Sequence, residues 1–107
     1  MTSKYRARGF RDGDGLWWAS QAEYRRWREL QVLEAAGAIG NLRRQVGYPL
    51  EVNGQKICRY VADFVYEQAG AEIVEDVKGF RTPEYKLKAA LMKACYGVEI
   101  REVPGGR

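Results

Sequence analysis

Histidine is absent from the 107 residues of this chain. Its absence excludes Ser-His-Asp hydrolases, Cys-His proteases, His-ligated zinc sites and every nuclease whose general base is a histidine. Any catalysis here must therefore use carboxylates, lysine, tyrosine or a metal held by oxygen ligands. The two cysteines, Cys58 and Cys95, have no C-x-x-C spacing, so they indicate neither a zinc ribbon nor a disulfide scaffold.

Long apolar runs are also missing. No stretch approaches the roughly 18 uncharged apolar residues that a membrane span needs, and the first residues do not read as a signal peptide. We therefore expect no membrane partner and a cytoplasmic location. The composition is 46% hydrophobic and 12% aromatic, which is enough to form a core, and 107 residues correspond to one domain of typical size.

The formal charge of +4 comes entirely from the first half of the chain. Residues 1–47 carry nine basic and five acidic side chains, whereas residues 48–107 carry nine of each. Much of the excess lies in an expected N-terminal arm, residues 1–14, whose basic residues are Lys4, Arg6, Arg8 and Arg11. Such an arm can contact phosphates, although a solvated terminus is an equally good interpretation of a charge run. The composition favours an anionic partner without establishing one.

Cap and turn signals predict two helices. Ser20 is a helix start and Gly37 a stop, with an apolar stripe between them. Thr82 and Pro83 are strong start signals for a second helix, which is expected to end at Gly97.

Runs of β-branched and aromatic residues predict four strands. After a loop that carries Arg43 and Arg44, strands are expected over 48–52, 56–67 and 72–78, and a last one over 98–103. The order of helix, three strands, helix and strand predicts one α/β domain over residues 15–103, with a mixed sheet of about four strands flanked by helices. Residues 104–107 are expected to be a frayed tail.

The third of these strands carries charges on both faces, which is unusual inside a small sheet. Asp76 and Lys78 share one face because side chains alternate along a strand. A hairpin turn centred between Ala69 and Gly70 places Asp63 directly opposite Asp76 on the preceding strand. The same register places Lys78 opposite Val61, unless a glycine bulge at the turn shifts the pairing by one residue.

Two carboxylates in directly opposed positions have Cβ atoms about 4.5–5.5 Å apart and repel each other unless a proton or a cation lies between them. A divalent hard cation with oxygen ligands relieves the repulsion. Lys78, on the same face, can then orient a water or stabilise developing negative charge. The alternative is an exposed face on which Asp76 and Lys78 form a weak surface ion pair, worth at most about 1 kcal/mol.

Glu23 is a candidate third acid of this site. It lies four residues before Trp27, on the apolar stripe of the first helix, where a charge is unexpected. Ser20-Gln21-Ala22-Glu23 is also a capping box, in which the Glu23 side chain would accept a hydrogen bond from the Ser20 amide. Spacing alone favours the cap.

The strands that carry the acid pair resemble the signature of PD-(D/E)xK nucleases, in Tyr60-Val61-Ala62-Asp63-Phe64 and Val74-Glu75-Asp76-Val77-Lys78-Gly79. More narrowly, the chain is similar to a family of small phage-borne proteins of that superfamily, with a Ser-x-x-Glu helix, an Ala-Asp-Phe strand and an Asp-Val-Lys-Gly strand. Its layout is also similar to that of phage endonuclease I-type Holliday-junction resolvases. The similarity covers about residues 15–103. Ala62 replaces the proline of the signature, and Asp76 stands where glutamate is common, which demands a tighter site.

The resemblance implies a restriction-endonuclease-like core and a metal-dependent endodeoxyribonuclease that hydrolyses DNA phosphodiester bonds. Branched DNA, such as Holliday junctions in phage recombination, is a candidate substrate, and the compartment would be the host cytoplasm. The resemblance further implies that Asp63, Asp76 and Glu23 hold Mg²⁺, for which Mn²⁺ can substitute, and that Lys78 is the catalytic lysine. Junction resolution requires two symmetrically placed active sites, so a homodimer is expected if that substrate is right.

Phosphate contacts are expected from the basic arm, from Arg43 and Arg44, and from Lys86 near the start of the second helix. For Lys86, a solvated position on the helix surface is an equally good interpretation. The main alternative function is a nucleic-acid-binding module without catalysis, which would use the basic arm for phosphates and Trp17 and Trp18 for base stacking. Tryptophans are more often core residues, so this signal is weak.

Overall fold

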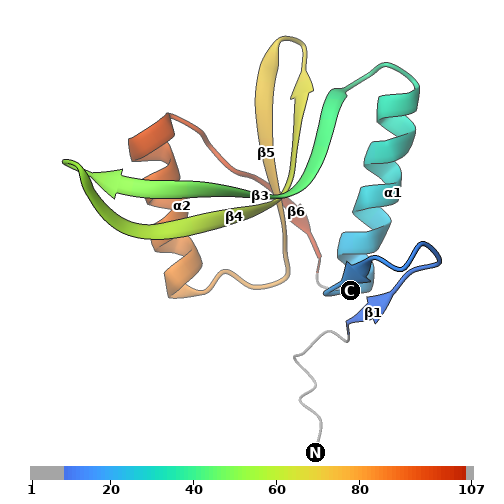
Figure 1. Cartoon of the computed structure of the whole chain (residues 1–107), viewed down its shortest axis with the longest axis horizontal. Coiled ribbons are helices and arrows are strands. Elements are labelled where there is room, and N and C mark those ends of the chain that lie inside the picture. Colours follow the sequence, from blue (N-terminus) through green and yellow to red (C-terminus); the bar gives the residue numbers. More distant parts are fainter. Residues whose placement is uncertain (1–8, 106–107) are drawn as a thin grey trace, which may run out of the picture.

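The computed structural model describes residues 9–105. Its main sheet contains four strands in the spatial order β3 (Gly40–Val52), β4 (Gln55–Gln68), β5 (Ala71–Lys78) and β6 (Arg101–Pro104). The first three strands pair antiparallel, and β6 runs parallel to β5. Helix α1 (Gln21–Ala35) and helix α2 (Pro83–Tyr96) flank the sheet on opposite sides, as Figure 1 shows. The expected mixed α/β fold, with its order of helix, three strands, helix and strand, is confirmed.

The two helices begin and end at the expected residues. The side-chain oxygens of Ser20 and Thr82 each accept a hydrogen bond from the backbone amide three residues later, which caps α1 and α2. Gly97 and Gly37 follow the last turns with left-handed φ values of 68° and 81°, a conformation in which glycine has no steric penalty. Within residues 9–105, neither helix is long and apolar enough to cross a membrane.

Strand β3 is much longer than the expected strand over 48–52. Arg43 and Arg44, expected in a loop, lie inside β3 and pair with Val65 and Phe64 of β4. The loop prediction was wrong because pairing with a long neighbouring strand overrides the weak strand preference of these residues.

The last strand also differs from its prediction. It covers Arg101–Pro104 rather than 98–103. The Gly105 amide donates to the carbonyl of Lys78 at 3.1 Å, so the expected fraying does not begin at residue 104. Parallel pairing with β5 holds this end of the chain.

Two apolar clusters attach the helices to the sheet. The cluster under α1 is centred on Trp18, Leu30, Ile39, Phe64 and Tyr66. The cluster under α2 is centred on Leu50, Tyr60, Ala62, Val65, Val74, Tyr85 and Met92. Each helix therefore covers its own face of the sheet.

The β3–β4 ribbon changes sides at one position. On β3, Leu42 packs with the α1 cluster, whereas Val46 packs with the α2 cluster, although residues four apart on a regular strand share a face. The alternation is broken at Gln45, whose φ is 56°. Pairing with β4 is recorded on either side of Gln45 and Asp63 but not between them. Asp63 thus sits where the ribbon bends from one helix toward the other.

The end of the expected arm is part of a small hairpin, whose turn lies at residues 12–15. Strand β1 (Phe10–Arg11) pairs with β2 (Trp17–Trp18). The Asp12 carboxylate accepts hydrogen bonds from two turn amides and from the Trp18 indole. Trp18 is completely buried, as expected of a core residue, whereas Trp17 is 55% exposed.

Candidate functional site

The β4–β5 hairpin has the predicted register. Its turn consists of Ala69 and Gly70, both with positive φ (52° and 82°), which matches the twist of a two-residue hairpin. Pairing continues from this turn as far as Phe64 opposite Glu75. No glycine bulge shifts it, so the next opposed positions are those of Asp63 and Asp76.

The backbone ladder ends at this point. The Asp63 carboxylate accepts a hydrogen bond from the Val77 amide at 2.8 Å, so a side chain takes the place of a backbone acceptor. The expected pairing of Val61 with Lys78 is absent from the ladder. That part of the prediction was wrong because the two strands separate once the Asp63 side chain lies between them.

The carboxyls of Asp63 and Asp76 are close enough to perturb each other. Asp76 is only 3% exposed, and burial together with the neighbouring Asp63 carboxyl raises its pKa to about 8. Burial, reinforced by the Glu23 carboxyl, raises the pKa of Asp63 to about 6. The two carboxyls therefore titrate as a coupled pair and carry less than two full negative charges near neutral pH.

Two side chains fix the position of Asp76. The Tyr60 hydroxyl donates to its Oδ2 at 2.6 Å, and Lys78 Nζ lies 3.7 Å from the same oxygen. Sequence reasoning missed Tyr60 because an aromatic residue on a central strand is expected in the core. Its hydroxyl, which needs a partner when buried, was the available signal.

Glu23 reaches the acid pair from α1. It is 7% exposed, and its Oε1 accepts a hydrogen bond from the Ala19 amide at 3.3 Å. The helix cap therefore exists, but Glu23 closes it at Ala19 rather than at Ser20 as expected. The same carboxyl raises the pKa of Asp63. Glu23 therefore caps the helix and lies beside the acid pair at the same time.

Lys78 is held over an aromatic ring. Its Nζ lies 4.2 Å from the ring centroid of Tyr85, a cation–π contact, and the Tyr85 hydroxyl donates to Glu102 at 2.9 Å. Lys78, Asp63 and Asp76 share a cleft of about 310 Å³, which is completed by Arg59, Tyr60, Val61, Thr82, Glu84, Tyr85 and Lys88. The cleft therefore places the half-buried Asp63 and the buried Asp76 beside the cation of Lys78.

A family model matches residues 2–103, nearly the whole chain. The chain belongs to the DUF1064 family. The members of that family are described as proteins of unknown function. No curated protein and no solved structure is significantly similar to the chain. The function of this DUF1064 protein therefore has to be argued from the chemistry of its site.

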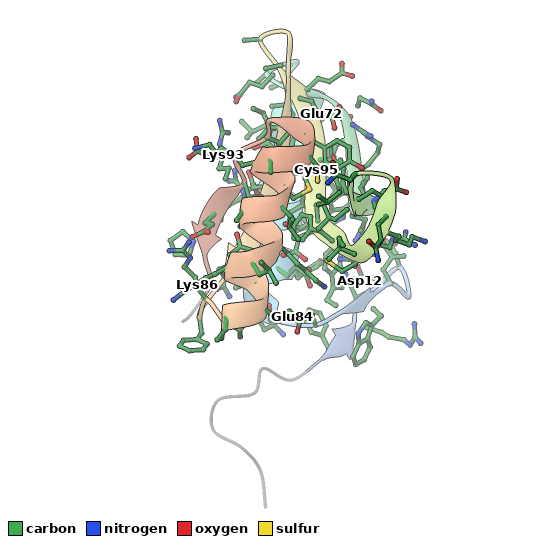
Figure 2. All side chains as sticks on the ribbon, turned by 90° about the vertical axis from the view of Figure 1, so that its left-hand side faces the viewer. Asp12, Glu72, Glu84, Lys86, Lys93 and Cys95 are labelled. Carbon is green, nitrogen blue, oxygen red and sulfur yellow. The ribbon has the colours of Figure 1, made fainter. Side chains whose placement is uncertain are left out.

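The basic residues expected to contact phosphate are dispersed over the DUF1064 fold. Lys4, Arg6 and Arg8 lie outside the described residues. Arg11 donates to the Gly15 carbonyl and Arg43 to the Asn41 carbonyl, while the Arg44 guanidinium stacks 3.8 Å above the Trp18 ring. Lys86 alone of the described set lies near the cleft, in a hollow that includes Lys78. Figure 2 shows Lys86 and Glu84 at the N-terminal end of α2.

The donor set of the cleft fits a hard divalent cation. Among residues 9–105, no group of three or more His, Cys, Asp or Glu side chains is arranged to hold a metal ion. Mg²⁺, however, is commonly bound by one or two carboxylates, with water and substrate phosphate completing the shell. Asp63 and Asp76 satisfy that requirement, whereas Glu23 is partly engaged by the helix cap.

The stability of this DUF1064 protein in EDTA is expected to fall as the pH rises from about 5 to about 8.5. Asp63 and Asp76 have folded-state pKa values of about 6 and about 8, above the ordinary 3.8. Between these limits the folded state binds more protons than the unfolded state, so each rise in pH favours unfolding. We expect the melting temperature to drop by at least roughly 5 °C across this range, corresponding to about 1 kcal/mol or more.

Thermal melts with Mg²⁺ in place of EDTA provide the comparison. Because Mg²⁺ binds only the deprotonated carboxylates, it should restore the melting temperature near pH 8 and have little effect near pH 5. A melting temperature that is independent of pH in EDTA would contradict the close approach of the two carboxyls.

Proposed function

We propose that this chain is a metal-dependent endodeoxyribonuclease that hydrolyses DNA phosphodiester bonds. The observation that carries the proposal is the pair of half-buried Asp63 and buried Asp76 in one cleft with Lys78. Such a pair disfavours the folded state at neutral pH, and carboxyls whose pKa values are raised in this way cluster at catalytic and metal-binding sites. A cation held by two carboxylates next to a lysine can neutralise the negative charge of a phosphodiester and activate a water for its hydrolysis.

The sequence around these residues supports the same chemistry. Ala62-Asp63-Phe64 on β4 and Asp76-Val77-Lys78-Gly79 at the end of β5 resemble the PD-(D/E)xK nuclease signature. Under this proposal the DUF1064 domain is a small member of that superfamily. The confirmed register of the β4–β5 hairpin is consistent with it, because it brings the two halves of the signature to neighbouring positions.

Each residue of the cleft has a defined task in this mechanism. Asp63 and Asp76 would hold Mg²⁺ through carboxylate oxygens, and Tyr60 restricts the rotation of Asp76 through its hydrogen bond. When bound, Mg²⁺ supplies a water of lowered pKa and neutralises charge on the scissile phosphate. Glu23 is placed to accept a hydrogen bond from a water beside Asp63.

Lys78 is the cation of the cleft whose ammonium group lies beside Asp76, 3.7 Å from its Oδ2. Its ammonium group can donate to a phosphate oxygen and stabilise the charge that develops there, or orient the attacking water. The attacking water forms the new P–O bond and gives up a proton to solvent, the opposite ester P–O bond breaks, and the leaving oxygen takes up a proton from solvent, so that protons balance. The Tyr85 ring limits the positions that the lysine can adopt.

The substrate of this reaction is DNA, and branched DNA would require a homodimer with two active sites. The test is incubation of the full chain with supercoiled plasmid and with four-way-junction DNA, in Mg²⁺, Mn²⁺ or EDTA. We expect cutting in either metal and none in EDTA. Lys78→Met should slow cutting by about 10²–10³-fold, the usual effect of removing one group that stabilises a transition-state charge.

Lys93→Met is the matched control, because Lys93 lies on α2 toward the end opposite to Lys86 (Figure 2) and is 71% exposed. This variant should cut at the wild-type rate. Salt-sensitive DNA binding without cutting under any divalent ion would overturn the nuclease proposal in favour of the non-catalytic binding module.

A further inference from the structure

The loop between β5 and α2 exposes an aromatic side chain directly beside the cleft. Phe80 stands two residues after Lys78 and is 77% exposed, more than any other large hydrophobic side chain in residues 9–105. It belongs to neither apolar cluster. Its ring therefore contributes little to the stability of the fold, and it remains available to contact a ligand.

The surroundings of Phe80 are strongly cationic. Phe80 lines a hollow of about 420 Å³ together with Lys78, Gly79, Arg81, Lys86 and Glu102. The single acid of this hollow, Glu102, is neutralised by Arg81 at 3.3 Å and accepts the Tyr85 hydroxyl. Lys78 lines both this hollow and the cleft of the acid pair, so the two adjoin at this residue.

An apolar ring among cations matches a ligand that has a flat apolar face and flanking negative charges. A nucleotide within a DNA strand has this combination: its base can stack on an aromatic ring, while its phosphates contact lysine and arginine. The position of Lys78 between the ring and the acid pair places the stacked base next to the phosphate that would be cut.

We infer that Phe80 stacks on a base adjoining the scissile phosphate, and that the chain thereby selects DNA whose bases are unpaired at the cleavage site. This inference rests on the nuclease function proposed above. In an intact duplex the faces of the bases are covered by their neighbours, so stacking on Phe80 first requires unstacking of comparable cost. In single strands, flaps and junction centres that cost is small, and the stacking contact becomes net affinity.

Binding without cleavage tests the inference. The full chain, kept in EDTA at one fixed salt concentration, is titrated against a labelled single-stranded oligonucleotide and against the duplex of the same sequence. We expect Phe80→Ala to weaken single-strand binding by about 5- to 150-fold, the range observed for one aromatic–base stack, and duplex binding by less than about twofold. Phe80→Tyr, which keeps the ring, should bind both as the wild type does.

Leu87→Ala is the matched control, since Leu87 is an exposed apolar residue of α2 (59% exposed) that does not line the hollow. Leu87→Ala should change neither the affinity for single-stranded DNA nor the affinity for the duplex. A 2-aminopurine base in the single strand should lose fluorescence on binding the wild type and Phe80→Tyr, but much less on binding Phe80→Ala.

Equal losses for single-stranded and duplex DNA in Phe80→Ala, or no loss for either, would overturn the inference. The result is independent of cutting: a chain that never cuts but shows this selective loss supports base stacking and contradicts the nuclease proposal. A chain that cuts with Mg²⁺ but binds equally well after Phe80→Ala contradicts the stacking role alone.

Discussion

Asp76→Asn is expected to stabilise the folded chain and to abolish its cleavage of DNA. Asparagine has the shape of aspartate without its charge, so it can still accept the Tyr60 hydroxyl and can donate to Asp63, while the repulsion between the two carboxylates is lost. Near pH 8, in EDTA, the melting temperature should rise by roughly 5 °C, corresponding to about 1 kcal/mol. Near pH 5 the gain should disappear, because Asp76, with its pKa of about 8, is already protonated there.

Cleavage should respond in the opposite direction. An amide oxygen is a much poorer ligand for Mg²⁺ than a carboxylate, and loss of metal stabilisation worth several kcal/mol corresponds to a rate decrease of about 10³-fold or more. The two effects together define a residue retained for function at the expense of stability. Plasmid cleavage in Mg²⁺ and melting in EDTA, measured on the same preparation, check both halves.

Glu72→Gln is a matched control for this variant. Glu72 is also a β5 carboxylate that accepts a tyrosine hydroxyl, from Tyr48 at 2.9 Å, but it is exposed at the hairpin tip, far from α2 residues Glu84 and Lys86 (Figure 2). Glu72→Gln should leave cleavage unchanged and should not raise the melting temperature near pH 8. A destabilised Asp76→Asn near pH 8 would contradict the repulsion argument, whatever its effect on cleavage.

The acid pair could be predicted from sequence because local signals fix the hairpin that carries it. Ala69-Gly70 sets a two-residue turn, and a two-residue turn sets the register of both strands. The register then decides which residues stand opposite each other. Phe64 is opposite Glu75, so the next residues along the two strands, Asp63 and Asp76, are also opposed. Helix caps are equally local, which is why Ser20, Thr82 and Gly97 mark their helix ends correctly.

Features that depend on distant contacts could not be predicted in the same way. The length of β3 is set by its partner β4 rather than by its own residues, which is why the sequence predicts a loop at Arg43 and Arg44. The bend at Gln45 has no sequence signal, since glutamine is not favoured at positive φ. The separation of the strands beyond Asp63 arises from one side chain that hydrogen-bonds to the backbone, which pairing rules for regular strands do not include.

An ion pair on the other face of β5 could not be predicted from the sequence either. Glu75 is completely buried. Arg26 of α1 binds both of its oxygens, with Nε 2.7 Å from Oε1 and Nη2 2.9 Å from Oε2, and the Tyr66 hydroxyl donates to Oε2. Forty-nine residues separate the two charges in the chain, so nothing local in the sequence indicates that they meet.

Arg26→Met is expected to lower the free energy of unfolding by about 3–5 kcal/mol, because it leaves the Glu75 charge buried without its partner. The double variant Arg26→Met/Glu75→Gln should recover most of this loss, since the remaining amide is neutral and can still accept the Tyr66 hydroxyl. Urea unfolding of the wild type, both single variants and the double variant gives the coupling energy directly. Arg28→Met, an exposed substitution on the same helix, should change stability by less than about 0.5 kcal/mol.

This ion pair also connects the stability of the fold to the geometry of the cleft. Arg26 lies one turn after Glu23 on α1, and Glu75 is the neighbour of Asp76 on β5, so the pair holds the helix that carries one acid of the site against the strand that carries another. Because misplacement of a catalytic group by about 1 Å can slow a reaction by about 10²-fold, the double variant should cut DNA more slowly than the wild type even where its stability has recovered. Equal cutting by the folded double variant and the wild type would show that the helix is positioned by its apolar cluster alone.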